Sequence, residues 1–296
     1  MIRALLSLFR TGWRQERPSA WMMFLQAGAS ATLVARGWLT WRWDSPIRGL
    51  AWQEEWWSGL LEKQFDIPWS TFAKASDPYI TSGLLVIGAL LIAIGFVPWI
   101  IIHPRLQKLR GLLWLGSALL ALDSIARWVG KDYDFGMAIE HSLQILAPIA
   151  LFLATSGRAN EKVLTLLLGV GSAFTFIGHG LYAIGFHPVP LSYQSMTMKL
   201  LSLGSEGTIR FLFLVGALDL VAAAALLIRP LRVAGLLYMT AWGFLTALAR
   251  VASHVGASQP LHGLDPWIAE TLVRTSHWLL PLLLLGLLPR REEKLS

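Results

Sequence analysis

The sequence predicts an all-α integral membrane protein with eight transmembrane helices, arranged as two parallel four-helix repeats, and three observations support this. Of its 296 residues, 55% are hydrophobic and only 15% are charged, whereas charged residues make up roughly a quarter of an ordinary soluble domain. The apolar residues fall in blocks of about 20, the length that crosses a bilayer as a helix. Several short motifs also occur twice in the same order, which indicates an internal duplication.

The eight apolar blocks cover residues 21–40, 81–102, 111–129, 138–155, 163–186, 210–228, 233–253 and 269–288. Small or polar residues interrupt the first and the fourth. We expect all eight to be helices, because backbone groups in the hydrocarbon layer must be hydrogen-bonded within their own segment.

The duplication divides the chain into a first unit at 21–155 and a second unit at 163–288. Each unit has a basic residue followed by glycine late in its first apolar block, Arg36-Gly37 and His179-Gly180. The motifs 87–90 (IGAL), 111–114 (GLLW) and 128–130 (WVG) return as 215–218 (VGAL), 235–238 (GLLY) and 254–256 (HVG). An even number of helices per unit gives both units the same orientation in the membrane.

The distribution of basic residues predicts the orientation. With the N-terminus inside, 14 lysines and arginines lie in the tails and inner loops, and only 6 lie in the outer loops. Cytoplasmic loops carry such an excess, so we expect both termini to be cytoplasmic and the protein to lie in the bacterial inner membrane. Because topology accounts for the net charge of +7, we expect membrane lipids and other membrane subunits as partners, and no nucleic acid.

Amphipathic segments flank the apolar blocks. Residues 1–20 place apolar side chains on one helical face and arginines opposite, which predicts a short helix in the cytoplasmic interface. Residues 289–296 form a cytoplasmic tail. The first outer loop contains Trp52, Trp56, Trp57 and Leu60 at helical spacing, and residues 196–203 form a shorter counterpart in the second unit. This tryptophan-rich segment would lie at headgroup depth, either packed on the bundle or as a lid over a ligand.

Missing residue types and motifs exclude several chemistries. The chain has no cysteine, which excludes disulfides, thiol relays and cysteine-ligated clusters. It also has no P-loop, nucleophile elbow or His-Glu-x-x-His motif.

Each unit resembles the DoxX-like family of four-helix membrane proteins. The resemblance is carried by the Arg36-Gly37 and His179-Gly180 pairs, by the long amphipathic segment before the second helix, and by the Gly-Ala-Leu of that helix. It implies a tandem duplication of a four-helix membrane unit, linked in some relatives to quinone or oxidative-stress complexes. The second helix carries Asp219 in one unit but Leu91 in the other, so a function of this acid is confined to one half.

Ionisable and amide side chains inside spanning helices are costly and therefore mark candidate sites. Most of those found here lie in the outer half of the membrane, and Asp219 reaches the midplane. Some could instead reach the interface or simply hold helices together. The candidate ligand-binding residues are Arg36, Asp123, Arg127, His141, Gln144, His179, Asp219, Arg250, Arg274 and His277.

Spacing relates several of these candidates. Asp123 and Arg127 are four residues apart, which predicts an ion pair along one helix face. His141 and Gln144 precede Pro148 by seven and four residues, and Arg274 and His277 precede Pro281 by the same distances. Haem ligation by His141 and His277 is disfavoured because their positions in the two units differ by one turn, and no short ligand spacing indicates a metal site.

Three functions remain open at this point. The first is an accessory or anchoring subunit of a membrane complex, with a quinone or lipid as its cofactor, as the resemblance implies. The second is a binding or transport protein for an amphipathic anion, held by Arg36, His179, Arg274 and His277. The third is an enzyme acting on a lipid or quinone headgroup, with Asp219 or His277 as proton donor or acceptor. No complete catalytic constellation is visible, which favours the first.

Overall fold

The computed structural model describes residues 20–256 and 261–288, and this part of the chain is helical throughout, without a strand. The predicted interfacial helix at 1–20 and the tail at 289–296 lie outside the described residues, apart from Ala20. The helices are α2 (Ala20–Arg42), α3 (Ile47–Ala51), α4 (Glu54–Phe65), α5 (Trp69–Ile100), η1 (Pro104–Gly111), α6 (Leu112–Val129), α7 (Phe135–Glu140), α8 (Ser142–Thr155), α9 (Glu161–Ala183), α10 (Leu191–Leu201), α11 (Ser205–Ala225), α12 (Arg232–Ala252), η2 (Leu261–Leu264), α13 (Asp265–Val273) and α14 (Thr275–Leu287).

The helices confirm an integral membrane protein. Six helical segments among the described residues are long and apolar enough to cross a membrane, namely Trp69–Ile100, Pro104–Val129, Phe135–Thr155, Glu161–Ala183, Ser205–Ala225 and Arg232–Ala252. Neither α2 nor the α13–α14 pair is among these six. Both carry buried polar side chains, such as Gln26 and Arg36 in α2 and Ser276 and His277 in α14, which lowers their mean hydropathy.

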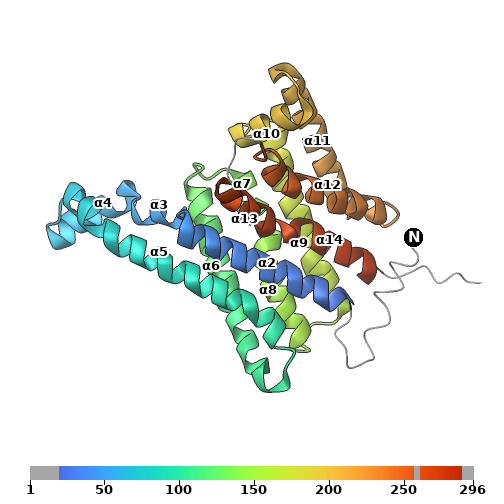
Figure 1. Ribbon diagram of the computed structural model, residues 1–296, viewed down its shortest axis with the longest axis horizontal. Helices are drawn as coiled ribbons and strands as arrows, with labels where there is room; N and C mark the ends of the chain where they lie inside the picture. Colours follow the sequence, from blue (N-terminus) through green and yellow to red (C-terminus); the bar gives the residue numbers. More distant parts are fainter. Residues whose placement is uncertain (1–19, 257–260, 289–296) are drawn as a thin grey trace, which may run out of the picture.

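Four helices, α2, α8, α9 and α14, form the centre of the molecule. Helix α2 packs on α8, α13 and α14, while α9 packs on α7, α8 and α14. Helices α5 and α6 lie on one side of this centre, and α11 and α12 lie on the other (Figure 1). The first helix of each sequence unit therefore contacts the last helix of the other unit, so the two halves interlock.

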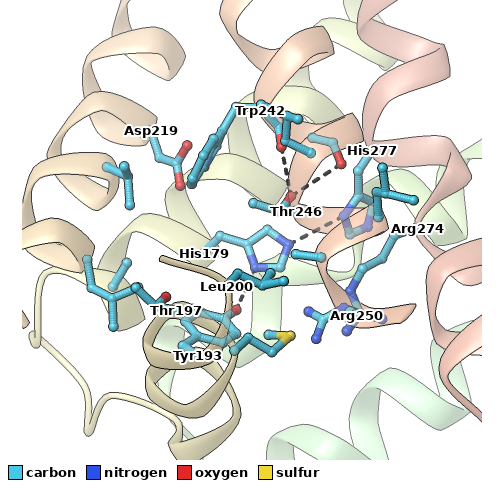
Figure 2. A pocket seen from close by; sticks show the side chains of 18 of the residues that line it. His179, Tyr193, Thr197, Leu200, Asp219, Trp242, Thr246, Arg250, Arg274 and His277 are labelled. Atoms are coloured by element: carbon cyan, nitrogen blue, oxygen red, sulfur yellow. Dashed lines mark hydrogen bonds between the residues drawn. The ribbon is translucent and has the colours of Figure 1, made fainter. Parts of the chain in front are cut away.

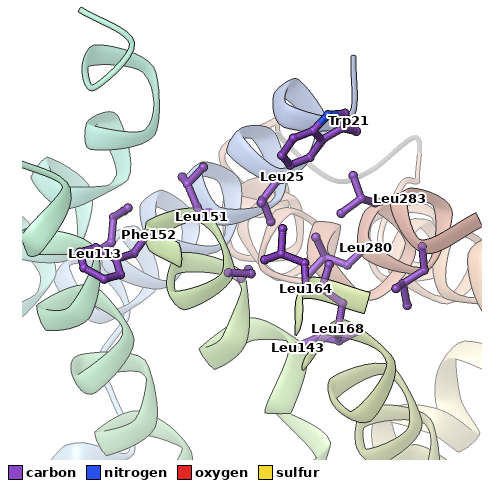
Figure 3. Packing of buried hydrophobic residues seen from close by; sticks show 14 of the residues in the cluster. Trp21, Leu25, Leu113, Leu143, Leu151, Phe152, Leu164, Leu168, Leu280 and Leu283 are labelled. Atoms are coloured by element: carbon purple, nitrogen blue, oxygen red, sulfur yellow. The ribbon is translucent and has the colours of Figure 1, made fainter. Parts of the chain in front are cut away.

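A continuous apolar core joins the central helices. Leu25 of α2, Leu143 and Leu151 of α8, Leu168 of α9 and Leu280 of α14 are all fully inaccessible to solvent (Figure 3). Because lipid tails are as apolar as leucine, close van der Waals packing rather than exclusion of water holds this core together. Large apolar side chains on the flanking helices, such as Phe96 of α5 and Phe213 of α11, are instead exposed, as expected for a membrane protein.

Glycines allow two pairs of helices to approach closely. A Cβ atom on Gly88 of α5 would lie 2.8 Å from the carbonyl oxygen of Gly37 in α2. In the second unit, a Cβ atom on Gly180 of α9 would lie 2.9 Å from the carbonyl oxygen of Gly216 in α11. Small residues at such crossings are typical of membrane helices.

Two carboxylates connect the units at the ends of the central helices. Asp265 accepts hydrogen bonds from the indoles of Trp38 and Trp43, both at 2.7 Å. Asp134 accepts a hydrogen bond from Tyr182 at 3.0 Å and lies 3.0 Å from Nδ1 of His187. In each case the acid belongs to one unit and its partners belong to the other.

Three features of the helices differ from or refine the sequence prediction. Helix α5 begins at Trp69 rather than near residue 81, directly after Pro68, whose backbone is extended, and Arg48 pairs with Asp77 in this first part of the helix. Both segments predicted as amphipathic helices are helical, as α4 and α10, and α4 buries no residue. The fourth and eighth blocks are each divided, at His141 and Arg274, where the backbone turns into the same conformation near φ −90° and ψ +8°.

Candidate functional site

A cavity of about 370 Å³ lies within the second unit, between α9, α10, α11, α12 and α14. Its wall is mainly apolar, with Phe211, Met196, Leu200 and Trp242 among the lining residues. Five of the predicted site residues also line it: His179, Asp219, Arg250, Arg274 and His277. A mostly apolar cavity with a few convergent polar groups is the usual form of a ligand site.

Two guanidinium groups lie together on one side of the cavity (Figure 2). Arg274 forms an ion pair with Glu270, one helical turn before it. Arg250 has only 8% of its surface exposed, and its side chain forms no ion pair or hydrogen bond with the described residues. Because an unpaired buried charge is costly, Arg250 is the group in this cavity that most requires a partner.

Asp219 lies on the opposite side of the cavity from the two arginines (Figure 2). Its carboxyl group accepts a hydrogen bond of 3.0 Å from the hydroxyl of Tyr238. The cavity is therefore polar at both sides and apolar between them.

A hydrogen-bonded chain of side chains starts at the cavity and crosses into the first unit. The hydroxyl of Tyr193 lies 2.9 Å from Nδ1 of His179, and Nε2 of His179 lies 3.4 Å from Nδ1 of His277. Nε2 of His277 in turn lies 3.1 Å from Nε2 of Gln144, whose Oε1 accepts a hydrogen bond of 3.3 Å from Arg36. Residues of α10, α9, α14, α8 and α2 thus form one connected network.

The chain ends in a buried ion-pair cluster around Asp123. This carboxylate lies 3.4 Å from Nε of Arg36 and 2.8 Å from Nε of Arg127, and it accepts a hydrogen bond from Ser45 at 3.3 Å. The predicted pairing of Asp123 with Arg127 is confirmed. Arg36 and Asp123 are 2% and 3% exposed, so this pair is shielded from solvent, whereas Arg127 is partly exposed.

The structure separates the predicted residues into those that line the cavity and those that lie in or beside the Asp123 cluster. Arg36 was expected to hold an anion, but its guanidinium group is paired with Asp123 and hydrogen-bonded to Gln144, and Arg36 does not line the cavity. His141 is buried beside the cluster, with no hydrogen-bond partner for Nδ1. Within residues 20–256 and 261–288, no group of three His, Asp or Glu side chains could hold a metal ion.

Sequence reasoning missed Tyr193. It lies in α10, outside the six spans, and reaches the cavity beside His179. Burial, together with the negative charge of Glu140, raises the pKa of the Tyr193 hydroxyl above its usual value. The hydroxyl therefore remains protonated at neutral pH. The amphipathic pattern of 196–203 located this helix but gave no reason to single out a tyrosine within it.

Comparison with protein-family models, with curated proteins and with solved structures finds no match to this chain.

Proposed function

We propose that this membrane protein binds an amphipathic monoanion, with the anionic head beside Arg250 and Arg274 and the hydrocarbon part in the apolar cavity. The observation that carries this proposal is the guanidinium group of Arg250, which is buried in the cavity wall without a partner among the described residues. A bound carboxylate or phosphate ester would supply the missing charge and accept hydrogen bonds in the fork geometry that arginine favours.

The one guanidinium group without a direct ion pair supports a single negative charge on the ligand. At this side of the cavity Glu270 pairs with Arg274, whereas Glu140 acts on Arg250 only from beyond ion-pair distance. A monoanion would give Arg250 a counter-charge in direct contact, whereas a neutral ligand would not. The apolar lining by Phe211, Met196 and Leu200 favours a hydrocarbon chain attached to that head.

The architecture that we propose for this function is a tandem DoxX-like duplication with eight spans and both termini in the cytoplasm. The equivalent glycine contacts, Gly37 with Gly88 and Gly180 with Gly216, support two related units. In this arrangement the second unit holds the ligand, and Leu91 replaces the cavity acid in the first unit.

A role as an accessory subunit of a membrane complex, in the bacterial inner membrane and linked to a quinone, is our second candidate. It is favoured by α4, which lies at one end of the molecule and exposes Trp56, Trp57 and Leu60 (Figure 1). Such an exposed aromatic surface suits either a partner subunit or the headgroup layer.

Purification in a mild detergent followed by lipid extraction and mass spectrometry tests the first candidate. We expect a bound amphipathic anion in the wild type, and at least a tenfold lower occupancy in Arg250→Met. Arg250 is preferable to Arg274 for this test, because removing Arg274 would leave Glu270 unpaired. Arg210→Met is the matched control, because Arg210 pairs with Glu206 on an exposed face, and its occupancy should equal that of the wild type.

Equal occupancy in Arg250→Met and the wild type would overturn the proposed site. A stoichiometric protein partner in the same preparation, lost when Trp56 and Trp57 are replaced by serine, would favour the second candidate.

A further inference from the structure

The hydrogen-bonded chain between the two units has a defined direction, because Arg36, at its end in the first unit, can only donate. The guanidinium group of Arg36 has no acceptor atom. The atom of Gln144 that faces it, 3.3 Å away, is therefore the amide oxygen. The amide nitrogen of Gln144 then points to Nε2 of His277, 3.1 Å away, and donates to it.

This donation fixes the tautomers of both histidines. Because Nε2 of His277 accepts, the imidazole of His277 carries its hydrogen on Nδ1 and donates it to Nε2 of His179, 3.4 Å away. His179 in turn carries its hydrogen on Nδ1. That nitrogen faces the hydroxyl of Tyr193 at 2.9 Å and a carboxylate oxygen of Glu140 at 3.5 Å. Glu140 forms no hydrogen bond with that nitrogen, so the hydrogen-bonded chain from Arg36 sets the tautomer.

The last step places a hydrogen-bond donor at the cavity. Since Nδ1 of His179 donates to the oxygen of Tyr193, the hydroxyl hydrogen of Tyr193 is free to point elsewhere. Tyr193 lines the cavity that also contains Arg250 and Arg274 (Figure 2). All three groups can then donate to one ligand head.

We propose that Arg36, in the first unit, is a positioning residue that makes Tyr193 a hydrogen-bond donor to the ligand head in the second unit. This inference rests on the proposed function and narrows the ligand to one whose head accepts hydrogen bonds, such as a carboxylate on a hydrocarbon chain. It also gives the first unit a role in binding, although Arg36 does not touch the cavity.

Binding of dodecanoate and of dodecanol to the full-length protein in detergent, measured by calorimetry, tests the proposal. A hydrogen bond to a charged group contributes about 1.5 kcal/mol or more, so Tyr193→Phe should weaken dodecanoate binding about tenfold or more. Arg36→Met should cause a similar loss, and Arg36→Lys, which keeps a group that only donates, should restore most of it. Binding of dodecanol, whose neutral hydroxyl accepts a weaker hydrogen bond, should change less in each variant.

A double variant separates this mechanism from general damage. If Arg36 acts through Tyr193, then Arg36→Met combined with Tyr193→Phe should lose no more affinity than either single variant. Additive losses would overturn the proposal. Gln144→Leu provides a second break in the chain that leaves the ion pairs of Asp123 intact, should Arg36→Met fail to fold.

Nitrogen NMR of ¹⁵N-histidine reads the tautomers without any ligand. We expect His179 and His277 to carry hydrogen on Nδ1 in the wild type and in Arg36→Lys, and a mixture of tautomers in Arg36→Met and Gln144→Leu. Hydrogen on Nε2 of either histidine in the wild type would overturn the inference. Failure of the wild type to bind dodecanoate, with the tautomers as expected, would instead count against the proposed function.

Discussion

Individual ionisable residues in this protein differ mainly in their surroundings. Asp123 and Glu206 each pair with an arginine four residues later on the same helix, at 2.8 and 2.6 Å. The side chain of Asp123 is 4% exposed and that of Glu206 is 81% exposed. Water screens the second pair, whereas the first pair lies where an isolated charge is costly. Similar geometry therefore has different energetic consequences.

Asp123→Asn should destabilise the protein, because it keeps the shape of the side chain but leaves Arg36 and Arg127 without their carboxylate. We expect a loss of about 3 kcal/mol, in line with other buried ion pairs that lose one partner. Thermal unfolding in detergent measures the change. Glu206→Gln is the control and should unfold at the wild-type temperature, and equal stability of the two variants would contradict this account.

At the scale of helices, close contact depends on which face a glycine occupies. Gly83 and Gly88 both lie within α5, five residues apart. A Cβ atom on Gly83 would have no neighbour within 4 Å, whereas one on Gly88 would lie 2.7 Å from Cβ of Trp41 and 2.8 Å from the carbonyl oxygen of Gly37. Of these two glycines, Gly88 is the one that lies where α5 approaches α2.

Alanine substitutions distinguish the two glycines. Gly88→Ala should lower stability by about 2 kcal/mol, because backbone atoms of α2 cannot move aside without separating the helices. Gly83→Ala should be neutral or stabilising by roughly 0.5 kcal/mol, because alanine favours the helix. The measurement is resistance to unfolding by an ionic detergent, and a loss of stability in both variants would argue against a specific contact.

At the scale of the whole molecule, the interlocked halves and the asymmetry of basic residues predict one topology. We expect eight spans, including α2 and the α13–α14 pair, which lie in the centre of the helix arrangement (Figure 1). These two elements supply Arg36 and His277 to the network, so their polar faces would be turned inward, away from lipid.

Single cysteines test this topology, because the natural chain contains none. Lys63→Cys and Lys199→Cys should react with a membrane-impermeant maleimide in intact cells. Arg10→Cys, Lys162→Cys and Arg229→Cys should react only after the membrane is opened. Labelling of the cysteines at 10 and 63 from the same side would show that α2 does not cross the membrane.

The sequence by itself determined the membrane class, the helical segments and the Asp123–Arg127 pair. These follow from hydropathy and from spacing along one helix, which are local properties of the chain. Each of the eight apolar blocks coincides with helix in the structure, although α5 begins before its block, at Trp69.

Only the tertiary structure decided which polar residues share a site. From the sequence we expected Arg36 to hold the anion, with Arg250 as one further candidate, yet Arg36 pairs with Asp123 and Arg250 faces a cavity. The contact of Gln144 with His277 joins residues 133 positions apart. Such contacts arise from the packing of whole helices, and no periodicity within a segment records which distant segment will lie beside it.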